Sequence, residues 1–314
     1  MSADGPRIEP YPTEAAWLAA RKTGVGSSDT PILTGLSDFK SPWQLWAERV
    51  GLAELDPQET EYQKWGRRLQ APILAGYADE TGRIVRNVQN VLYRDPARAW
   101  LIASPDGFIQ QGGQDLAPVE AKNVSSWKGE DWEESAPPLY LVQVQHQLLV
   151  TRAEYAVLVA LIGGNRLRHL EVRPNLRLQE VILEAVETFW TQVQREIPPP
   201  VDGSDATRKI LMKAFGRPEP EKYISLPGAA AEWDREWQRL DAEIKEAEKA
   251  KGEIENRLRA EIGNAWGGEL PGGVKWTNAL VKRAEYTVPA SEYRRLSRSK
   301  QDTKKRKTPA ALSV

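Results

Sequence analysis

The chain has 314 residues, of which 40% are hydrophobic and 28% charged, and its formal net charge at pH 7 is −1. This length allows one large domain with an extension, and the charge balance by itself gives no indication of a nucleic-acid partner. The absence of cysteine excludes disulfides, thiolate metal sites and iron–sulfur clusters. Only two histidines are present, His146 and His169, which argues against a zinc site or a Ser–His–Asp triad. Any bound metal would be held by carboxylates and carbonyls, a ligand set that favours Mg²⁺ or Mn²⁺.

Residues 1–203 alternate between helix and strand patterns. We expect helices over residues 13–22, in PILTGL, in SPWQLWAERVGL, and over 60–82, 138–150 and 176–196. We expect strands within residues 83–93, 100–103 and 107–109, and over 118–123, 155–162 and 167–172. This order predicts an α/β domain with a mixed central sheet flanked by helices. No apolar run approaches the roughly 20 residues of a membrane span, and the first ten residues lack a signal-peptide pattern, so we expect no membrane association.

Residues 204–293 carry a different pattern. Apolar residues there keep a 4,3 heptad spacing that Lys251 interrupts: Trp233, Trp237, Leu240, Ile244, Ala247, Ile254, Leu258 and Ile262. This spacing predicts a coiled coil or a helical hairpin, followed by a small β element near Trp276. Residues 294–307 hold eight Lys or Arg against one Asp. We therefore expect a basic tail over 294–314, either disordered and solvated or bound to a polyanion.

One constellation of charged residues points to chemistry. Asp106 follows a Ser-Pro pair at a turn, and Glu120-Ala121-Lys122 begins fourteen residues later in an expected strand. Alternate residues of a strand share one face, so Glu120 and Lys122 point the same way. Two carboxylates and a backbone carbonyl form a site for Mg²⁺, which lowers the pKa of a bound water, and the lysine can orient that water. An ordinary surface strand with alternating Glu and Lys is the competing interpretation.

Five motifs in fixed order carry a resemblance to a known family. They are Arg21–Asp29 with Leu36–Trp46, Trp65–Ile73 with Tyr77 and Glu80–Gly82, Ser104–Gly107, Val119–Lys122, and Gln143–Gln147. In combination they resemble the YqaJ-type viral recombinase nucleases, relatives of lambda exonuclease within the PD-(D/E)XK superfamily, over about residues 15–200. The resemblance implies a restriction-endonuclease-like core with a C-terminal helical extension.

The same resemblance implies roles for individual residues. Asp106 and Glu120 match metal-binding carboxylates, Ala121 the carbonyl ligand and Lys122 the catalytic lysine. A second group matches residues that hold the 5′-terminal phosphate of DNA: Arg21, Ser28 and Gln143. Taken alone, Arg21 could be a surface cation at a helix end, Ser28 an N-cap, and Gln143 a solvated helix residue.

One motif position departs from the family pattern. The family has a glutamate in G-x-x-x-E, and this chain has Gln70 there. An amide offers one neutral oxygen and no charge. Three explanations are open: a weaker metal site, compensation by Asp79 or Glu80, or a catalytically impaired form, whether natural or introduced.

The resemblance implies a Mg²⁺- or Mn²⁺-dependent 5′→3′ double-strand DNA exonuclease that generates single strands for phage-type recombination. It further implies DNA ends as substrate, a single-strand annealing protein as partner, a ring-shaped homotrimer, and the cytoplasm of a bacterial or phage-infected cell. The alternative from another class is a DNA-end-binding or scaffold protein that keeps the fold but lacks activity. A third possibility is that the heptad region makes the chain mainly an interaction module.

Overall fold

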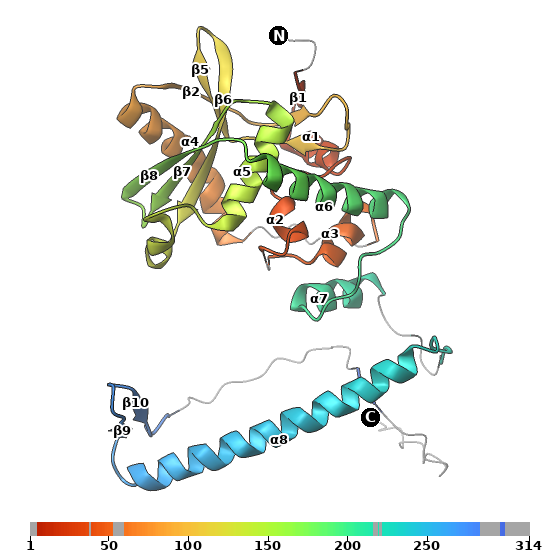
Figure 1. Cartoon of the computed structure of the whole chain (residues 1–314), viewed down its shortest axis with the longest axis vertical. Coiled ribbons are helices and arrows are strands. Elements are labelled where there is room, and N and C mark those ends of the chain that lie inside the picture. The colour runs from red at the N-terminus through yellow and green to blue at the C-terminus, as the bar shows by residue number, and fades with distance from the viewer. Residues whose placement is uncertain are drawn as a thin grey trace, which may run out of the picture. The chain divides into compact units, whose positions relative to one another are not determined.

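The computed structural model describes residues 5–37, 39–52, 60–215, 219, 222–282 and 296–298. The chain divides into two compact units, residues 1–216 and 217–314. The first unit holds the α/β domain and the second holds one long helix with a small hairpin (Figure 1).

A five-stranded mixed sheet forms the centre of the first unit, in the order β2-β5-β6-β7-β8. Its strands are β2 (Ile84–Asn87), β5 (Gly107–Gln111), β6 (Gln114–Val124), β7 (Ala156–Ile162) and β8 (Arg166–Val172). Only β6 and β7 are parallel, and the helix α5 (Pro138–Thr151) connects them as a crossover. A smaller sheet, in the order β1-β3-β4, comprises β1 (Arg7–Pro10), β3 (Val91–Arg94) and β4 (Ile102–Ala103).

Both faces of the central sheet are covered by helices. The helix α4 (Glu61–Thr81) packs its residues Ile73, Leu74 and Tyr77 against Val157 and Val159 of β7. The intervening β7 residues belong to a second apolar cluster on the opposite face, which α5 completes. Figure 1 shows α4 and α5 on these opposite sides of the sheet. Because β7 is buried on both faces, its sequence reads as a continuous apolar run.

The remaining helices of the first unit are α1 (Glu14–Arg21), α2 (Thr30–Leu33), α3 (Pro42–Arg49), α6 (Leu176–Gln194) and α7 (Asp205–Ala214), with two short 3₁₀ turns at Ser126–Lys128 and Glu130–Trp132. Of these helices, α2 and α6 pack against α5, α3 packs against α6, α7 packs against α3, and α1 lies against β3. The start of α4 is fixed by a capping box between Thr60 and Gln63, and its end by Gly82 at a φ of 69°. Only a residue that tolerates this left-handed conformation closes the helix at that point without strain.

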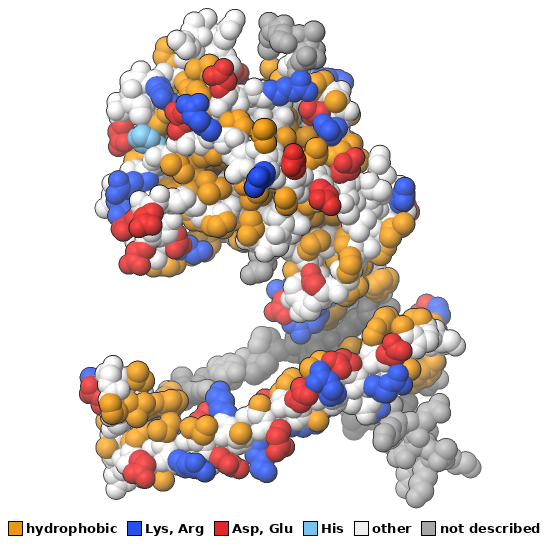
Figure 2. Space-filling model, viewed as in Figure 1, with side chains coloured by type: hydrophobic (Ala, Val, Ile, Leu, Met, Phe, Trp, Pro, Cys, Tyr) orange, Lys and Arg blue, Asp and Glu red, His pale blue; other side chains and the backbone are white. Residues whose placement is uncertain are grey.

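The second unit contains α8 (Ala230–Ile262) and the hairpin of β9 (Gly267–Glu269) and β10 (Lys275–Thr277). None of the residues of α8 is buried, and Figure 2 shows hydrophobic and charged side chains of both signs exposed along it. The heptad-patterned residues form one continuous helix and not a helical hairpin, and the expected β element carries Trp276. Most of the expected basic tail lies outside the described residues.

The predicted α/β fold with a mixed, helix-flanked sheet is confirmed. The boundary between the units differs from the expected one at residue 203, because α7 packs against the first unit: Ile210 lies in its apolar core and the Thr207 hydroxyl donates to Ser41 Oγ. The small sheet containing β1 was not expected. Among the described residues, no helix is both long enough and apolar enough to cross a membrane.

Candidate active site

Asp106 lies at the turn that leads from β4 into β5. The antiparallel register of β5 and β6 pairs Gly107 with Val119, which brings Asp106 level with Glu120. A Cβ atom on Gly107 would lie 2.9 Å from the Arg86 carbonyl oxygen, so glycine is required directly after the aspartate. Asp106 Oδ2 accepts a hydrogen bond of 2.8 Å from the backbone N–H of Ala121. The turn therefore holds the Asp106 carboxylate against the strand that carries the second carboxylate.

Glu120 and Lys122 project from the same face of β6, as alternation predicts. Their neighbours on the other face, Ala117 and Val119, pack against α4. The Lys122 ammonium lies 2.6 Å from Glu120 Oε1 and 5.0 Å from the centre of the Tyr140 ring. Glu120 is only 4% exposed, so the ion pair is largely shielded from water.

Two glutamines of α5, one helical turn apart, reach the same carboxylate. Gln143 Nε2 donates to Glu120 Oε1 at 2.6 Å, and its Oε1 accepts from Lys122 Nζ at 3.0 Å. Gln147 Nε2 donates to Glu120 Oε2 at 2.6 Å. Both oxygens of Glu120 are therefore held by donors, and its carboxylate is fixed in one orientation.

The proximity of two carboxylates changes the proton affinity of Asp106. Burial and the negative charge of Glu120 raise the pKa of Asp106 to about 8. Burial by itself lowers the pKa of Lys122, but the carboxylates of Glu120 and Asp106 outweigh it, so the net shift is upward. Lys122 is thus a stable cation, whereas Asp106 keeps its proton up to about pH 8.

The donor set at this point suits a hard divalent cation. Two carboxylates and the Ala121 backbone lie within one turn and one strand, and a cation between the carboxylates would relieve the repulsion that raises the pKa of Asp106. Among the described residues, however, no group of three His, Cys, Asp or Glu side chains could hold a metal. A metal bound here would have two charged ligands, with backbone, amide or water oxygens completing its shell.

Gln70 lies at the edge of this site. Its Nε2 donates to the backbone carbonyl of Asp106 at 3.1 Å and lies 3.4 Å from Asn87 Oδ1. Asp79 and Glu80 are about 14 Å farther along α4 at 1.5 Å per residue, so they are poorly placed to compensate for the missing carboxylate.

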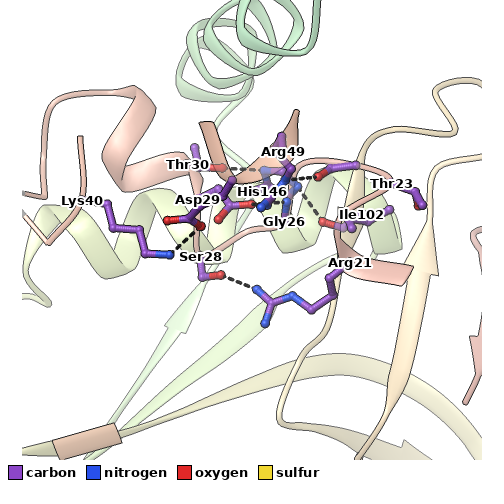
Figure 3. A network of polar contacts seen from close by, with 12 residues as sticks. Arg21, Thr23, Gly26, Ser28, Asp29, Thr30, Lys40, Arg49, Ile102 and His146 are labelled. Carbon is purple, nitrogen blue, oxygen red and sulfur yellow. Dashed lines mark hydrogen bonds and ion pairs between the residues drawn. The ribbon is translucent and has the colours of Figure 1, made fainter. Parts of the chain in front are cut away.

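Arg21 and Ser28, the two residues expected to hold a terminal phosphate, contact each other (Figure 3). Arg21 Nη2 donates to Ser28 Oγ at 2.8 Å, and its guanidinium lies 4.8 Å from the centre of the Trp17 ring. Burial lowers the pKa of Arg21, while the charges of Asp29 and Glu120 act in the opposite direction. The charge of Glu120 therefore acts on the Arg21 guanidinium, which also lies at the C-terminal end of α1.

A buried polar network fixes the loop that carries Ser28 (Figure 3). Asp29 accepts from the Gly26 N–H at 2.9 Å and from Arg49 Nη2 at 2.6 Å. His146 joins Thr30 Oγ1 at 2.7 Å to the Ile102 carbonyl oxygen at 3.0 Å. Burial lowers the pKa of His146 to about 4, so the ring is neutral, with its proton on Nε2 facing the carbonyl.

The network ties the Ser28 loop to the strand before Asp106. Val25 bonds to the backbone of Trp100 and Ile102 on either side. A Cβ atom on Gly24 would lie 2.4 Å from the Trp100 carbonyl oxygen, which explains the glycine. Ser28 is not a helix N-cap, because α2 starts at Thr30 with Asp29 in that position.

The structure thus brings together Asp106, Glu120, Ala121, Lys122 and Gln143, with Gln70 and the Arg21–Ser28 pair beside them. Gln143 is 8% exposed and contacts two site residues, which excludes a solvated helix residue. Sequence reasoning assigned no role to Gln147, Tyr140 or Trp17. The four-residue spacing of Gln143 and Gln147 on one helix could have indicated the first of these.

The mixed sheet carries one carboxylate in a turn and a second carboxylate with a lysine on the adjoining strand. This arrangement defines the PD-(D/E)XK class of fold. A family model described as the YqaJ-like viral recombinase domain matches residues 16–154. The protein YqaJ of Bacillus subtilis (strain 168) is 31% identical over 253 residues, which cover 79% of this chain and 78% of that protein. The chain therefore belongs to the YqaJ-like viral recombinase domain family.

One solved structure supports this fold. The crystal structure of LHK-Exo in complex with dAMP matches with a TM-score of 0.50 and 25% identity, over 59% of this chain and 94% of that one. A second structure of this alkaline exonuclease, from Laribacter hongkongensis, gives a TM-score of 0.49 and 23% identity over the same shares.

Proposed function

We propose that this chain is a Mg²⁺-dependent 5′→3′ double-strand DNA exonuclease that produces single strands for recombination. The observation that carries the proposal is the fixed contact between Glu120, Lys122 and Gln143, with Asp106 held level with them. Membership of a recombinase family and similarity to an alkaline exonuclease support the same reaction class.

The residues of the chain divide the chemistry among them. Asp106, Glu120 and the Ala121 carbonyl would hold Mg²⁺, which when bound supplies an acidified water and neutralises phosphate charge. Lys122 stays protonated and offers a donor to charge that builds on the phosphate in the transition state. Gln143 holds both Glu120 and Lys122 and so preserves their relative positions.

Arg21 and Ser28 would supply the end preference. A terminal phosphate carries more charge than an internal diester, and the guanidinium offers several charged donors to it. Their hydrogen bond of 2.8 Å directs the two side chains toward one point. Holding the DNA end there would set the distance from the end to the scissile phosphate.

The test is degradation of linear duplex DNA labelled at either the 5′ or the 3′ end, in Mg²⁺ or in EDTA. We expect early release of the 5′ label, only in Mg²⁺, and faster degradation of 5′-phosphorylated than of 5′-hydroxyl DNA. Asp106→Ala should abolish cleavage and leave DNA binding largely intact, since binding rests on phosphate contacts. Arg21→Ala should remove the phosphate preference; normal Mg²⁺-dependent cleavage by Asp106→Ala would overturn the site assignment.

Gln70 favours a second candidate, a DNA-end-binding protein with impaired catalysis. Its amide donates toward the Asp106 carbonyl and supplies no charge beside the cation. Gln70→Glu should then raise the cleavage rate and lower the Mg²⁺ concentration needed for half-maximal activity. A Mg²⁺ titration of both proteins decides this, because identical curves would place position 70 outside the metal site.

The family further suggests a ring-shaped homotrimer and a single-strand annealing protein as partner. Light scattering would give the mass of the assembly, and co-purification with a single-strand annealing protein would test the partnership.

A further inference from the structure

The long helix of the second unit presents an apolar seam without packing among the described residues. Trp233, Trp237, Leu240, Ile244 and Ile254 are between 44% and 65% exposed, and no residue of α8 is buried. Exposed apolar stripes of this length mark association surfaces. The helix itself is supported by intrahelical ion pairs, such as Lys245 with Asp241 at 2.7 Å and Arg259 with Glu255 at 3.1 Å.

The spacing of the seam assigns each residue a heptad position. Trp237, Ile244, Lys251 and Leu258 occupy the a positions, and Trp233, Leu240, Ala247, Ile254 and Glu261 the d positions; Ile262 lies one residue past the last d position. The seam is therefore the narrow a/d stripe of a two-stranded coiled coil. We propose that α8 pairs with α8 of a second copy of this chain as an antiparallel coiled coil.

The antiparallel orientation follows from the bulk of the seam residues. In an antiparallel pair, each a residue faces a d residue of the second copy. We choose the register in which Trp237 lies opposite Ile254 of the second copy and Trp233 lies opposite Leu258. Ile244 then lies opposite the small Ala247. A parallel pair would instead stack each tryptophan on its own copy and place Ala247 against Ala247, a poorer match of volumes.

Charge favours the same orientation. A parallel pair would bury Lys251 against Lys251, whereas the antiparallel register places Lys251 opposite Leu240, between Asp241 and Glu243 of the second copy. One flank also gains a pair of opposite sign, Glu236 with Arg257. In both orientations, acidic side chains beside the seam of one copy face acidic side chains of the other. In the parallel pair, Glu236 and Glu243 are among these repelling residues. Only the antiparallel pair offsets this repulsion with attractive contacts.

Single cysteines introduced into the full chain, which contains none, test both contact and orientation. Ala247 lies close to the twofold axis of the proposed pair, with its two copies separated along the axis by roughly 5 Å at 1.5 Å per residue. The two copies of residue 261 would be roughly 45 Å apart in the antiparallel pair but adjacent in a parallel one. Lys249 is at the outward-facing f position and serves as the control.

We expect mild oxidation to convert Ala247→Cys to a covalent dimer several-fold faster than Lys249→Cys, with Glu261→Cys at the control rate. A dimer from Glu261→Cys as fast as from Ala247→Cys would mean a parallel pair. Ala247→Cys at the control rate would mean that another occupant, or none, covers the seam. Either result overturns the proposal, and neither depends on nuclease activity.

A pair of matched glutamate substitutions gives an independent measurement. Ile244→Glu places a charge in the seam, and Ala242→Glu adds the same charge on the opposite face; both side chains are exposed in the free helix, so the fold of one chain is preserved. We expect Ile244→Glu to halve the mass measured by light scattering and Ala242→Glu to leave it unchanged. Equal masses for the wild type and Ile244→Glu at every concentration would contradict the pairing.

Discussion

Glu120 depends on two amide donors from one helix. Gln143 and Gln147 each lie 2.6 Å from a different oxygen of its carboxylate, and Gln147 is fully buried. A buried carboxylate that loses a donor retains its desolvation cost without the compensating bond, at about 1.5–3 kcal/mol for a hydrogen bond to a charged group. The amides that orient Glu120 are therefore as specific a part of the site as the carboxylates themselves.

We predict that Gln147→Leu lowers the cleavage rate about 10-fold or more and raises the Mg²⁺ concentration needed for half-maximal activity, because the Glu120 carboxylate is no longer fixed. Gln145→Leu is the matched control: its amide is also buried but bonds to the backbone of Arg173 and Asn175. Mg²⁺ titrations of cleavage and thermal unfolding of both variants measure the difference. If both variants shift the Mg²⁺ titration equally, Gln147 acts only on stability.

The raised pKa of Asp106 predicts a pH dependence of stability in the absence of metal. The folded chain keeps the Asp106 proton up to about pH 8, while an unfolded aspartate releases it near 4. The folded state binds the extra proton in this window, so its stability falls as pH rises from about 4 to about 8.

Asp106→Asn should remove that part of the dependence. In EDTA, we expect the variant to gain stability relative to the wild type between pH 5 and pH 8, as measured by urea unfolding. Mg²⁺ at pH 8 should stabilise the wild type and leave Asp106→Asn nearly unchanged. If the free energies of unfolding of the two proteins change equally with pH, the Asp106 carboxylate is already ionised at low pH in the folded state.

Among the elements, α7 decides where the first unit ends. Ile210 is 4% exposed within the core that α3 and α6 share, and Thr207 bonds to Ser41 at the start of α3. Heptad spacing and composition gave no sign of this contact, because α7 is short and its partner lies more than 150 residues away in sequence.

We predict that Ile210→Ala destabilises the chain by about 2–5 kcal/mol, the usual cost of truncating a buried isoleucine. Met212→Ala on the same helix is the control, since Met212 is 37% exposed. Urea unfolding of the two variants provides the comparison. A similar small loss for both would place α7 outside the cooperative unit of the domain.

At the scale of the whole molecule, every candidate site residue lies in the first unit. We therefore predict that truncation after residue 216 preserves Mg²⁺-dependent cleavage of short duplexes to within a few-fold. Truncation after residue 202 should instead lower stability, because it removes α7. Loss of cleavage in the longer fragment, with its fold intact by circular dichroism, would mean that the second unit takes part in the reaction or in the assembly it requires.

The sequence alone determined the class of the fold and identified the charged residues of the candidate site. Alternating strands, capped helices and the D…E-x-K spacing are local patterns, and they indicated Asp106, Glu120 and Lys122 as a candidate site, with an ordinary surface strand as the alternative. The motif order also associated Arg21, Ser28 and Gln143 with the site. Helix α8 was likewise visible as a heptad repeat.

Only the tertiary structure decided which groups complete the site and where the domain ends. Gln147 acts on Glu120 because α5 crosses the face of β6, and Thr30 meets His146 across 116 residues of sequence. The position of Gln70 beside the Asp106 carbonyl depends on how α4 packs on the sheet. These contacts arise from packing between segments that are distant in sequence, and local propensity does not predict which segments will pack together.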